Sequence, residues 1–151
     1  MSKKRTSKPT RPLVGTWRLT ALKARTPSGE TTYPWGRAVG GRLTYSSNGQ
    51  MSVQIMKANR LPFSSEDLEG GTAEEVQAAF DGYHAYFGTF SYDGRARTVT
   101  HRIEGSLFPN WIGHDQTRSV KLSTRGLTLT SSPILFGGQE VVFLAVWGRI
   151  R

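Results

Sequence analysis

The sequence predicts a mainly β fold, an antiparallel β-barrel of about eight strands with one amphipathic helix packed on it or across one end. Two observations lead to this prediction. Apolar and polar residues alternate over short segments along most of the 151 residues, as they do in half-buried strands. Asn-Gly and Asp-Gly pairs join two pairs of these segments, and such residue pairs form the turns of β-hairpins. Closing the strands into a barrel leaves no exposed sheet edge.

The expected strands follow one another as hairpins. In the first strand, Trp17 and Ala21 lie on one face. In a later hairpin, Val99, His101 and Ile103 share a face, so this histidine should point where its apolar neighbours point. The segments are 15–24, the hairpins 40–56, 88–105 and 117–131, and a last strand, 139–151, that is apolar on both faces.

One segment, 72–87, has helical instead of strand periodicity. Thr72 and Glu75 have the spacing of a capping box, and Gly88 can end the helix. The apolar face of this helix should be buried against the barrel or across its mouth. The residues on that face are Val76, Ala79, Phe80, Tyr83 and Phe87.

The charge of the chain is uneven. The sequence has 20 Lys and Arg residues against 11 Asp and Glu residues, a net charge of +9. Residues 1–12 are polar, basic and without periodicity, so we expect a disordered basic tail followed by a single domain over 13–151. The remaining chain has no matching Lys/Arg stripe, so a solubilising tail is favoured over specific nucleic-acid binding.

Several classes of chemistry are disfavoured. The chain has no cysteine, which excludes disulfides and Cys-ligated zinc. His84, His101 and His114 lack metal-binding spacing, and the glycines form no phosphate-binding motif, so neither a metal nor a cofactor is expected. No apolar run approaches the roughly 20 residues of a membrane span, and no signal-peptide pattern is present. We expect a cytoplasmic monomer or homodimer without membrane contact.

Several motifs carry a family resemblance. "LVGTWRL" contains a Gly-x-Trp motif, and "YPWG", "FDGYHAYFGTF" and "THRIEGSLFPNWIG" follow in order. Together they resemble the bacterial and fungal lipocalin-like domain proteins over roughly residues 13–149. The resemblance implies a lipocalin-like barrel in which Arg149 packs on Trp17. The Thr-Asp-Tyr motif of true lipocalins, a secretion signal and a disulfide are missing, which argues against a secreted carrier.

A ligand cavity is favoured over a filled core, because polar side chains occur on the apolar faces. Phe108 and Trp111 belong to the segment 104–113, which should leave its strand at Gly105 and fold both rings over one end of the barrel. The candidate ligand-binding residues are Trp17, Tyr45, Tyr83, Tyr86, His101, Phe108, Trp111 and Arg118.

Three residues are candidates for catalysis: His101, Arg118 and Glu104. His101 is either a proton shuttle or a buried neutral histidine bonded to a tyrosine hydroxyl or a backbone carbonyl. Arg118 either extends to the barrel rim or lies inside, facing Glu104 or a ligand carboxylate or enolate. Glu104 is out of register with His101 unless a bulge at Gly105 redirects it.

Three functions remain open on the sequence alone. The barrel binds a small, largely apolar metabolite, or it also acts as a cofactor-independent cyclase or isomerase on a polyketide- or terpenoid-like intermediate in the same cavity. In the second case His101, a tyrosine or Arg118 would polarise a carbonyl group. The third possibility is a structural module with a filled core.

Overall fold

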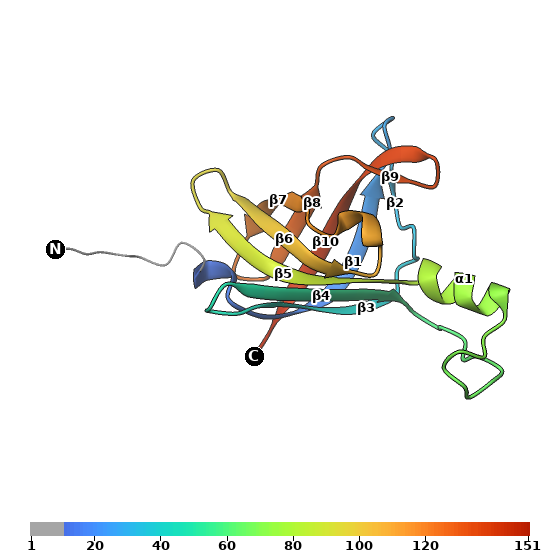
Figure 1. The fold of residues 1–151 in the computed structure, drawn as a ribbon. Coiled ribbons are helices and arrows are strands. Elements are labelled where there is room, and N and C mark those ends of the chain that lie inside the picture. The colour runs from blue at the N-terminus through green and yellow to red at the C-terminus, as the bar shows by residue number, and fades with distance from the viewer. Residues whose placement is uncertain (1–10) are drawn as a thin grey trace.

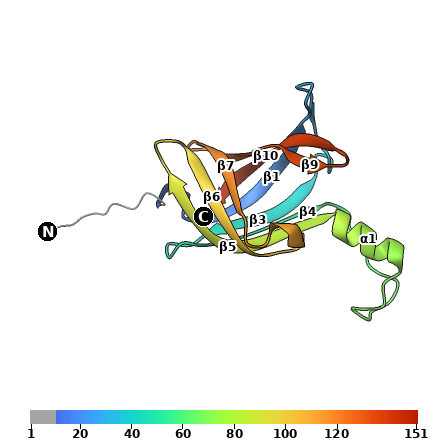
Figure 2. The same cartoon turned by 45° about the horizontal axis from the view of Figure 1, so that its top comes forward.

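The computed structural model describes residues 11–151 and confirms the predicted barrel. Eight antiparallel strands pair in the order β1, β3, β4, β5, β6, β7, β8, β10, and β10 pairs back with β1 to close the ring (Figures 1 and 2). These strands are β1 (Gly15–Arg25), β3 (Val39–Tyr45), β4 (Gln50–Lys57), β5 (Tyr83–Asp93), β6 (Thr98–Ser106), β7 (Asp115–Leu122), β8 (Leu127–Ser131) and β10 (Gln139–Ile150).

Two short strands extend the barrel at one end, β2 (Thr31–Thr32) beside β1 and β9 (Ile134–Phe136) beside β10. The predicted hairpin turns are present. Gly49, in the turn between β3 and β4, has φ 88°, the left-handed conformation that glycine tolerates. Asp93 instead begins a longer turn, in which its carboxylate accepts hydrogen bonds from the backbone of Arg95 and Ala96.

A bulge in β1 corrects one predicted face. The pairing of β1 with β10 shifts between Leu19 and Ala21. Beyond this shift Leu22 and Ala24 are buried, whereas Ala21, predicted to share the face of Trp17, is only half-buried. An extra residue in one strand reverses the alternation of side chains, which a strict period of two cannot anticipate.

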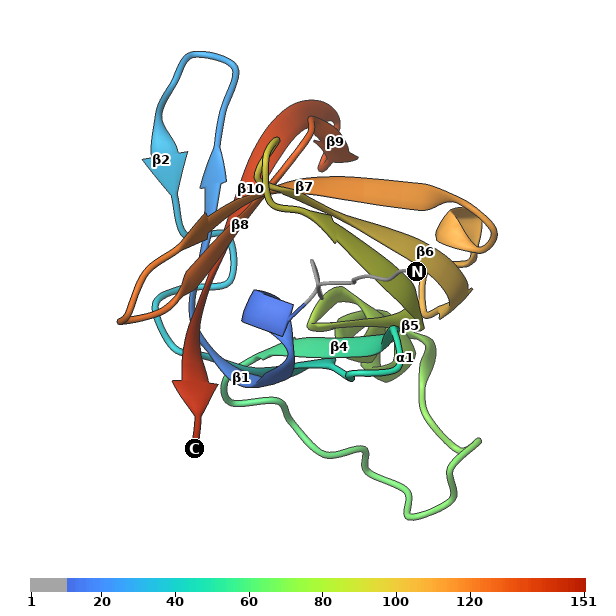
Figure 3. The same ribbon diagram turned by 90° about the vertical axis from the view of Figure 1, so that its left-hand side faces the viewer.

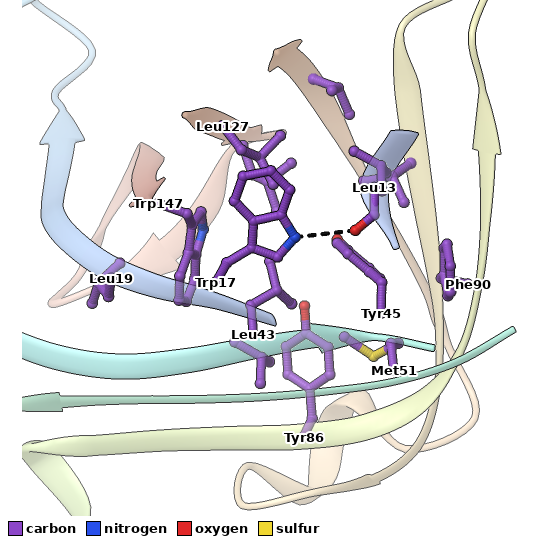
Figure 4. Packing of buried hydrophobic residues seen from close by; sticks show 14 of the residues in the cluster. Leu13, Trp17, Leu19, Leu43, Tyr45, Met51, Tyr86, Phe90, Leu127 and Trp147 are labelled. Atoms are coloured by element: carbon purple, nitrogen blue, oxygen red, sulfur yellow. Dashed lines mark hydrogen bonds between the residues drawn. The ribbon is translucent and has the colours of Figure 1, made fainter. Parts of the chain in front are cut away.

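One end of the barrel is closed by the 3₁₀-helix η1 (Arg11–Leu13), which Figure 3 shows in front of the ring of strands. Leu13 is fully buried, and its carbonyl accepts a hydrogen bond of 3.0 Å from the Trp17 indole nitrogen (Figure 4). Tyr45 and Leu127 are further fully buried members of the cluster that contains Leu13 and Trp17. Most of the predicted tail, residues 1–10, lies outside the described residues, and its last two residues, Arg11 and Pro12, belong to η1.

The Gly-x-Trp motif has a physical basis in this end of the barrel. Arg149 pairs with Trp17 across the strands and places its guanidinium 4.1 Å from the centre of the indole ring, as predicted. The guanidinium also donates to the carbonyls of Val14 and Pro12. Gly15 has φ 140°, and a Cβ atom there would lie 2.7 Å from Arg149 Nη1. Glycine is therefore required at the first position of the motif.

The predicted helix is shorter than expected. α1 (Ala73–Asp81) begins with the predicted capping box between Thr72 and Glu75 but ends at Gly82. Residues 83–87, predicted as helix, begin β5, because their backbone pairs with β4, and residues 86 and 87 also pair with β6. The prediction of a buried apolar helix face was also wrong, since Val76 is 53% exposed and Phe80 45% exposed.

Candidate functional site

A cavity of about 870 Å³ is lined in part by residues of α1 and β9. These two elements lie at the end of the barrel opposite η1 (Figures 1 and 2). Apolar and aromatic side chains dominate its wall, and a few polar groups converge on it, which is the usual composition of a small-molecule site. The apolar wall includes Trp35, Leu43, Val53, Ile55, Phe80, Phe108, Trp111, Leu129, Phe136, Phe143 and Trp147.

His101 is the central polar residue of this site. It is 2% exposed, and Val99 and Ile103 beside it on β6 are buried on the same face, as the alternation predicted. Its Nε2 lies 2.6 Å from the Tyr45 hydroxyl and its Nδ1 lies 2.6 Å from the Tyr86 hydroxyl. Burial, assisted by the positive charge of Arg118, lowers the pKa of His101 to about 3, so the imidazole is neutral near pH 7.

The surroundings of these two hydrogen bonds determine which atom donates the proton in each of them. A neutral imidazole donates through one nitrogen and accepts at the other. Tyr45 is buried outside the cavity wall, and His101 is its hydroxyl's sole hydrogen-bond partner among the described residues. If Tyr45 accepted from the ring, its own proton would be buried without an acceptor, which is costly. Tyr45 therefore donates to Nε2, Nδ1 donates to Tyr86, and the Tyr86 proton is directed to the cavity.

Arg118 brings a positive charge to the same wall. This β7 residue is 9% exposed, and its guanidinium donates to the Gln116 side-chain oxygen at 3.2 Å. It also lies 6.0 Å from the centre of the Trp111 ring, within the range of a cation–π contact. Burial raises the pKa of the Tyr86 phenol, and the nearby Arg118 charge opposes part of that rise.

The segment after β6 forms the aromatic side of the cavity. β6 ends at Ser106, and the 3₁₀-helix η2 (Pro109–Trp111) follows. The Trp111 ring packs edge-on against His84 and Tyr86, with centroid distances of 4.9 and 5.9 Å. Phe108 packs on Trp111 at 6.1 Å and is still 38% exposed at the mouth. Both rings contribute to the cavity wall, but the strand continues through Gly105 to Ser106, so the segment leaves it one residue later than predicted.

Two further polar atoms of the wall have no protein partner. The Nε2 of His84 and the indole Nε1 of Trp147 are buried without a hydrogen-bond partner among the described residues, and both side chains line the cavity. Buried polar groups in proteins are normally paired, so unpaired ones on a cavity wall are available to a ligand. Burial lowers the pKa of His84 to about 4, with a further contribution from Arg118.

Most of the predicted ligand-binding residues converge on the cavity, and one catalytic candidate does not. Tyr83, Tyr86, His101, Phe108, Trp111 and Arg118 all contribute to its wall. Trp17 and Tyr45 are in the closed core instead, and Tyr45 reaches the site only through His101. Glu104 is the extra residue of a bulge opposite Phe87 and Gly88, yet it is exposed and away from the cavity. Arg118 therefore does not face Glu104.

Among the wall residues that the sequence did not predict are His84, Trp35 and Trp147. His84 stands two residues before Tyr86, so a strand reading of this segment places both on one face. The predicted helix did not place His84 and Tyr86 on the same face. Trp147 lies in the last strand, whose apolar residues on both faces do not indicate which side is interior, and Trp35 lies in an irregular loop that periodicity does not orient.

Fold and cavity together define a β-barrel with an interior cavity. The chain belongs to the lipocalin-like domain family, whose model matches residues 14–150. The predicted family resemblance is thereby confirmed. A curated relative, the 4'-hydroxy-3'-methoxypropiophenone carrier protein ppsC of Aspergillus oryzae, is 33% identical over 107 residues, which cover 66% of this chain and 96% of the relative.

In residues 11–151 no three His, Asp or Glu side chains gather closely enough to hold a metal ion. The described helix lacks the length and apolar character needed to cross a bilayer. Tyr86, Arg118, His84 and Trp147 are among the groups of the wall that can offer polar contacts to a ligand.

Proposed function

We propose that this protein binds a small, largely apolar metabolite in the cavity and holds it by hydrogen bonds to oxygen atoms of the ligand. The observation that carries the proposal is the combination of an 870 Å³ aromatic cavity with polar groups that have no protein partner. The relative from Aspergillus oryzae supports it, because its name describes a carrier of an aromatic ketone. Such a ketone has a flat apolar ring and several oxygen acceptors, which match the aromatic wall and its donors.

Ligand titration tests this proposal directly. Three tryptophans, Trp35, Trp111 and Trp147, line the cavity, so a ligand there should quench or shift the intrinsic fluorescence. We expect saturable one-to-one binding of 4'-hydroxy-3'-methoxypropiophenone. An apolar dye, N-phenyl-1-naphthylamine, should compete with it. If neither compound binds to the folded protein, the cavity is not a site for such ligands and the proposal is wrong.

Catalysis is a second candidate function, and the proton chain from Tyr45 through His101 to Tyr86 favours it. A hydroxyl donor beside Arg118 can polarise a carbonyl group, as a cofactor-independent isomerase or cyclase requires. Burial lowers the pKa of both histidines in the cavity wall, to about 4 for His84 and about 3 for His101, so both are weak bases. Binding alone therefore fits the site better than proton abstraction.

Deuterium exchange separates the two functions. In heavy water, an enzyme that enolises a bound ketone should exchange the protons next to its carbonyl. We expect the protein to leave the exchange rate of 4'-hydroxy-3'-methoxypropiophenone near its rate in buffer. A rate enhancement that disappears in Tyr86→Phe would favour the isomerase or cyclase function instead.

A further inference from the structure

Arg118 is a buried cation without an ionic partner. Its residue exposure is 9%, and no described carboxylate lies within salt-bridge distance of it. Its hydrogen bond to Gln116 is to a neutral amide oxygen. Burying a charge is costly unless an opposite charge accompanies it, and a guanidinium has five N–H donors to satisfy. The described protein supplies neither an anion nor enough acceptors.

The carboxylates nearest to the cavity do not fill this role. Asp115 lines the wall, but it is half exposed and forms a salt bridge of 3.0 Å with Arg102. Asp81, at the end of α1, is exposed at the rim. The other titratable groups that face the cavity are Tyr83, His84, Tyr86 and His101, which are phenols and imidazoles and not carboxylates.

Tyr86 directs a second donor to the region that Arg118 faces. Both residues flank Trp111, whose ring lies 5.9 Å from the Tyr86 ring and 6.0 Å from the Arg118 guanidinium. The hydrogen bond from His101 leaves the Tyr86 proton for the cavity. A hydroxyl donor and a guanidinium on one apolar wall match a ligand oxygen that carries negative charge, because charge-assisted hydrogen bonds are the stronger ones.

We infer that the natural ligand carries an acidic oxygen, as a phenol, an enol or a carboxylic acid does, and that it binds as the anion with this oxygen against Arg118 and Tyr86. The inference rests on the proposed binding function and specifies its ligand. For a phenol or an enol, binding breaks the O–H bond, and the proton passes to water at the open mouth. His84 and His101 do not take it up, because burial keeps both imidazoles neutral.

A phenolic ketone reports its own ionisation. The phenolate of 4'-hydroxy-3'-methoxypropiophenone absorbs at longer wavelength than the phenol, so the spectrum of the bound probe gives its charge. We expect the bound probe to ionise at least about one pH unit below the free probe, which corresponds to about a tenfold gain in affinity as pH rises. Absorption and affinity would be measured between about pH 5.5 and about pH 9, where the buried tyrosines and histidines do not titrate.

A matched compound and two variants provide the controls. 3',4'-Dimethoxypropiophenone cannot ionise, so its affinity should not change with pH or with Arg118→Met by more than about twofold. Arg118→Met should abolish the early ionisation of the phenolic probe, whereas Arg118→Lys should retain part of it. Urea unfolding would confirm that both variants are folded at the pH values used.

The outcomes distinguish this inference from the binding function. If both ketones bind and the bound phenol ionises at or above the pH of the free phenol, the binding function stands and the inference is wrong. Retention of the early ionisation in Arg118→Met would also overturn it. If neither ketone binds the wild-type protein, the proposed function fails together with the inference.

Discussion

Tyr86 and Tyr45 bond the same histidine but face different surroundings. Removing either hydroxyl leaves one nitrogen of the buried His101 unpaired, which should cost about 1 to 3 kcal/mol of unfolding free energy. Only the Tyr86 hydroxyl belongs to the cavity wall. Tyr86→Phe should therefore also weaken ketone binding by about five- to tenfold per folded molecule, the worth of one net hydrogen bond.

Tyr45→Phe is the matched control for this prediction. His101 can still donate from Nδ1 to Tyr86, so the Tyr86 proton stays available and ligand affinity should remain within about twofold of wild type. Urea unfolding and fluorescence titration of both variants give the two quantities separately. An equal loss of affinity in both variants would contradict the proton direction assigned to the Tyr45–His101–Tyr86 chain.

The buried histidines also make stability depend on pH. The pKa values of His101 and His84 are lowered to about 3 and about 4, whereas both return to about 6.5 in the unfolded chain. Between these values the unfolded chain binds protons that the folded protein does not. Stability should therefore be complete above about pH 6.5 and fall as pH decreases, by about 1.4 kcal/mol per pH unit for each histidine.

Urea unfolding between about pH 7 and about pH 5 measures this slope, since most carboxylates stay ionised there. In His101→Asn, unfolding should take up one proton fewer, so the unfolding free energy should depend less steeply on pH. His84→Asn should reduce this dependence by the same amount. A stability that rises as pH falls through this range would mean that the imidazoles gain a buried anion, contrary to the described contacts.

The elements η2 and η1 lie at opposite ends of the barrel. η2 contains Trp111, and η1 contacts Trp17 through Leu13. Trp111 lies in the cavity wall and is half-buried, whereas Trp17 is 1% exposed in the closed core. Trp111→Ala should weaken ligand binding by about 1 to 3 kcal/mol with a smaller effect on folding. Trp17→Ala should instead cost about 3 to 5 kcal/mol of stability and leave the affinity of the folded fraction nearly unchanged.

Thermal melts and ligand titrations on these two variants compare the elements directly. If Trp111→Ala lost as much stability as Trp17→Ala while its folded fraction kept full affinity, η2 would be a plug of the core. The cavity would then lose its main aromatic contact as a binding determinant.

The elements also show what the sequence could and could not predict. Strands whose faces alternate strictly, such as β6 with Val99, His101 and Ile103, were predicted correctly, because burial on one face imposes a period of two. Residues 83–87 fit a helical pattern equally well, and only pairing with β4 and β6 makes them a strand. Because of that ambiguity, the position of His84 in the cavity wall was not predicted. The bulge in β1 was not predicted either, because it depends on pairing with β10, which is distant in the sequence.

For the molecule as a whole, the two ends of the barrel are chemically different. Around η1 the interior is filled by apolar side chains, and the indole of Trp17 is satisfied by Leu13. Toward η2 and β9 the interior opens, and Tyr86, Arg118, His84 and Trp147 present polar atoms to the cavity. The closed end thus supplies stability, and the open end can keep unpaired polar groups for a ligand.

Arg149 tests this division of the barrel. Its guanidinium covers Trp17 and donates to the carbonyls of Val14 and Pro12 at 2.9 and 3.0 Å, so it joins β10 to the start of the chain. Arg149→Met should remove these contacts and lower the unfolding free energy by about 1 to 2 kcal/mol. This value is kept small because solvent weakens such contacts at an exposed residue. Arg149→Lys should lose less stability, because lysine keeps the positive charge although it lacks the two-pronged donor geometry of arginine.

Because Arg149 lies outside the cavity wall, ligand affinity per folded molecule should stay within about twofold of wild type in both variants. A loss of affinity in Arg149→Met as large as that of Trp111→Ala would show that the two ends are energetically coupled, and the division would be wrong.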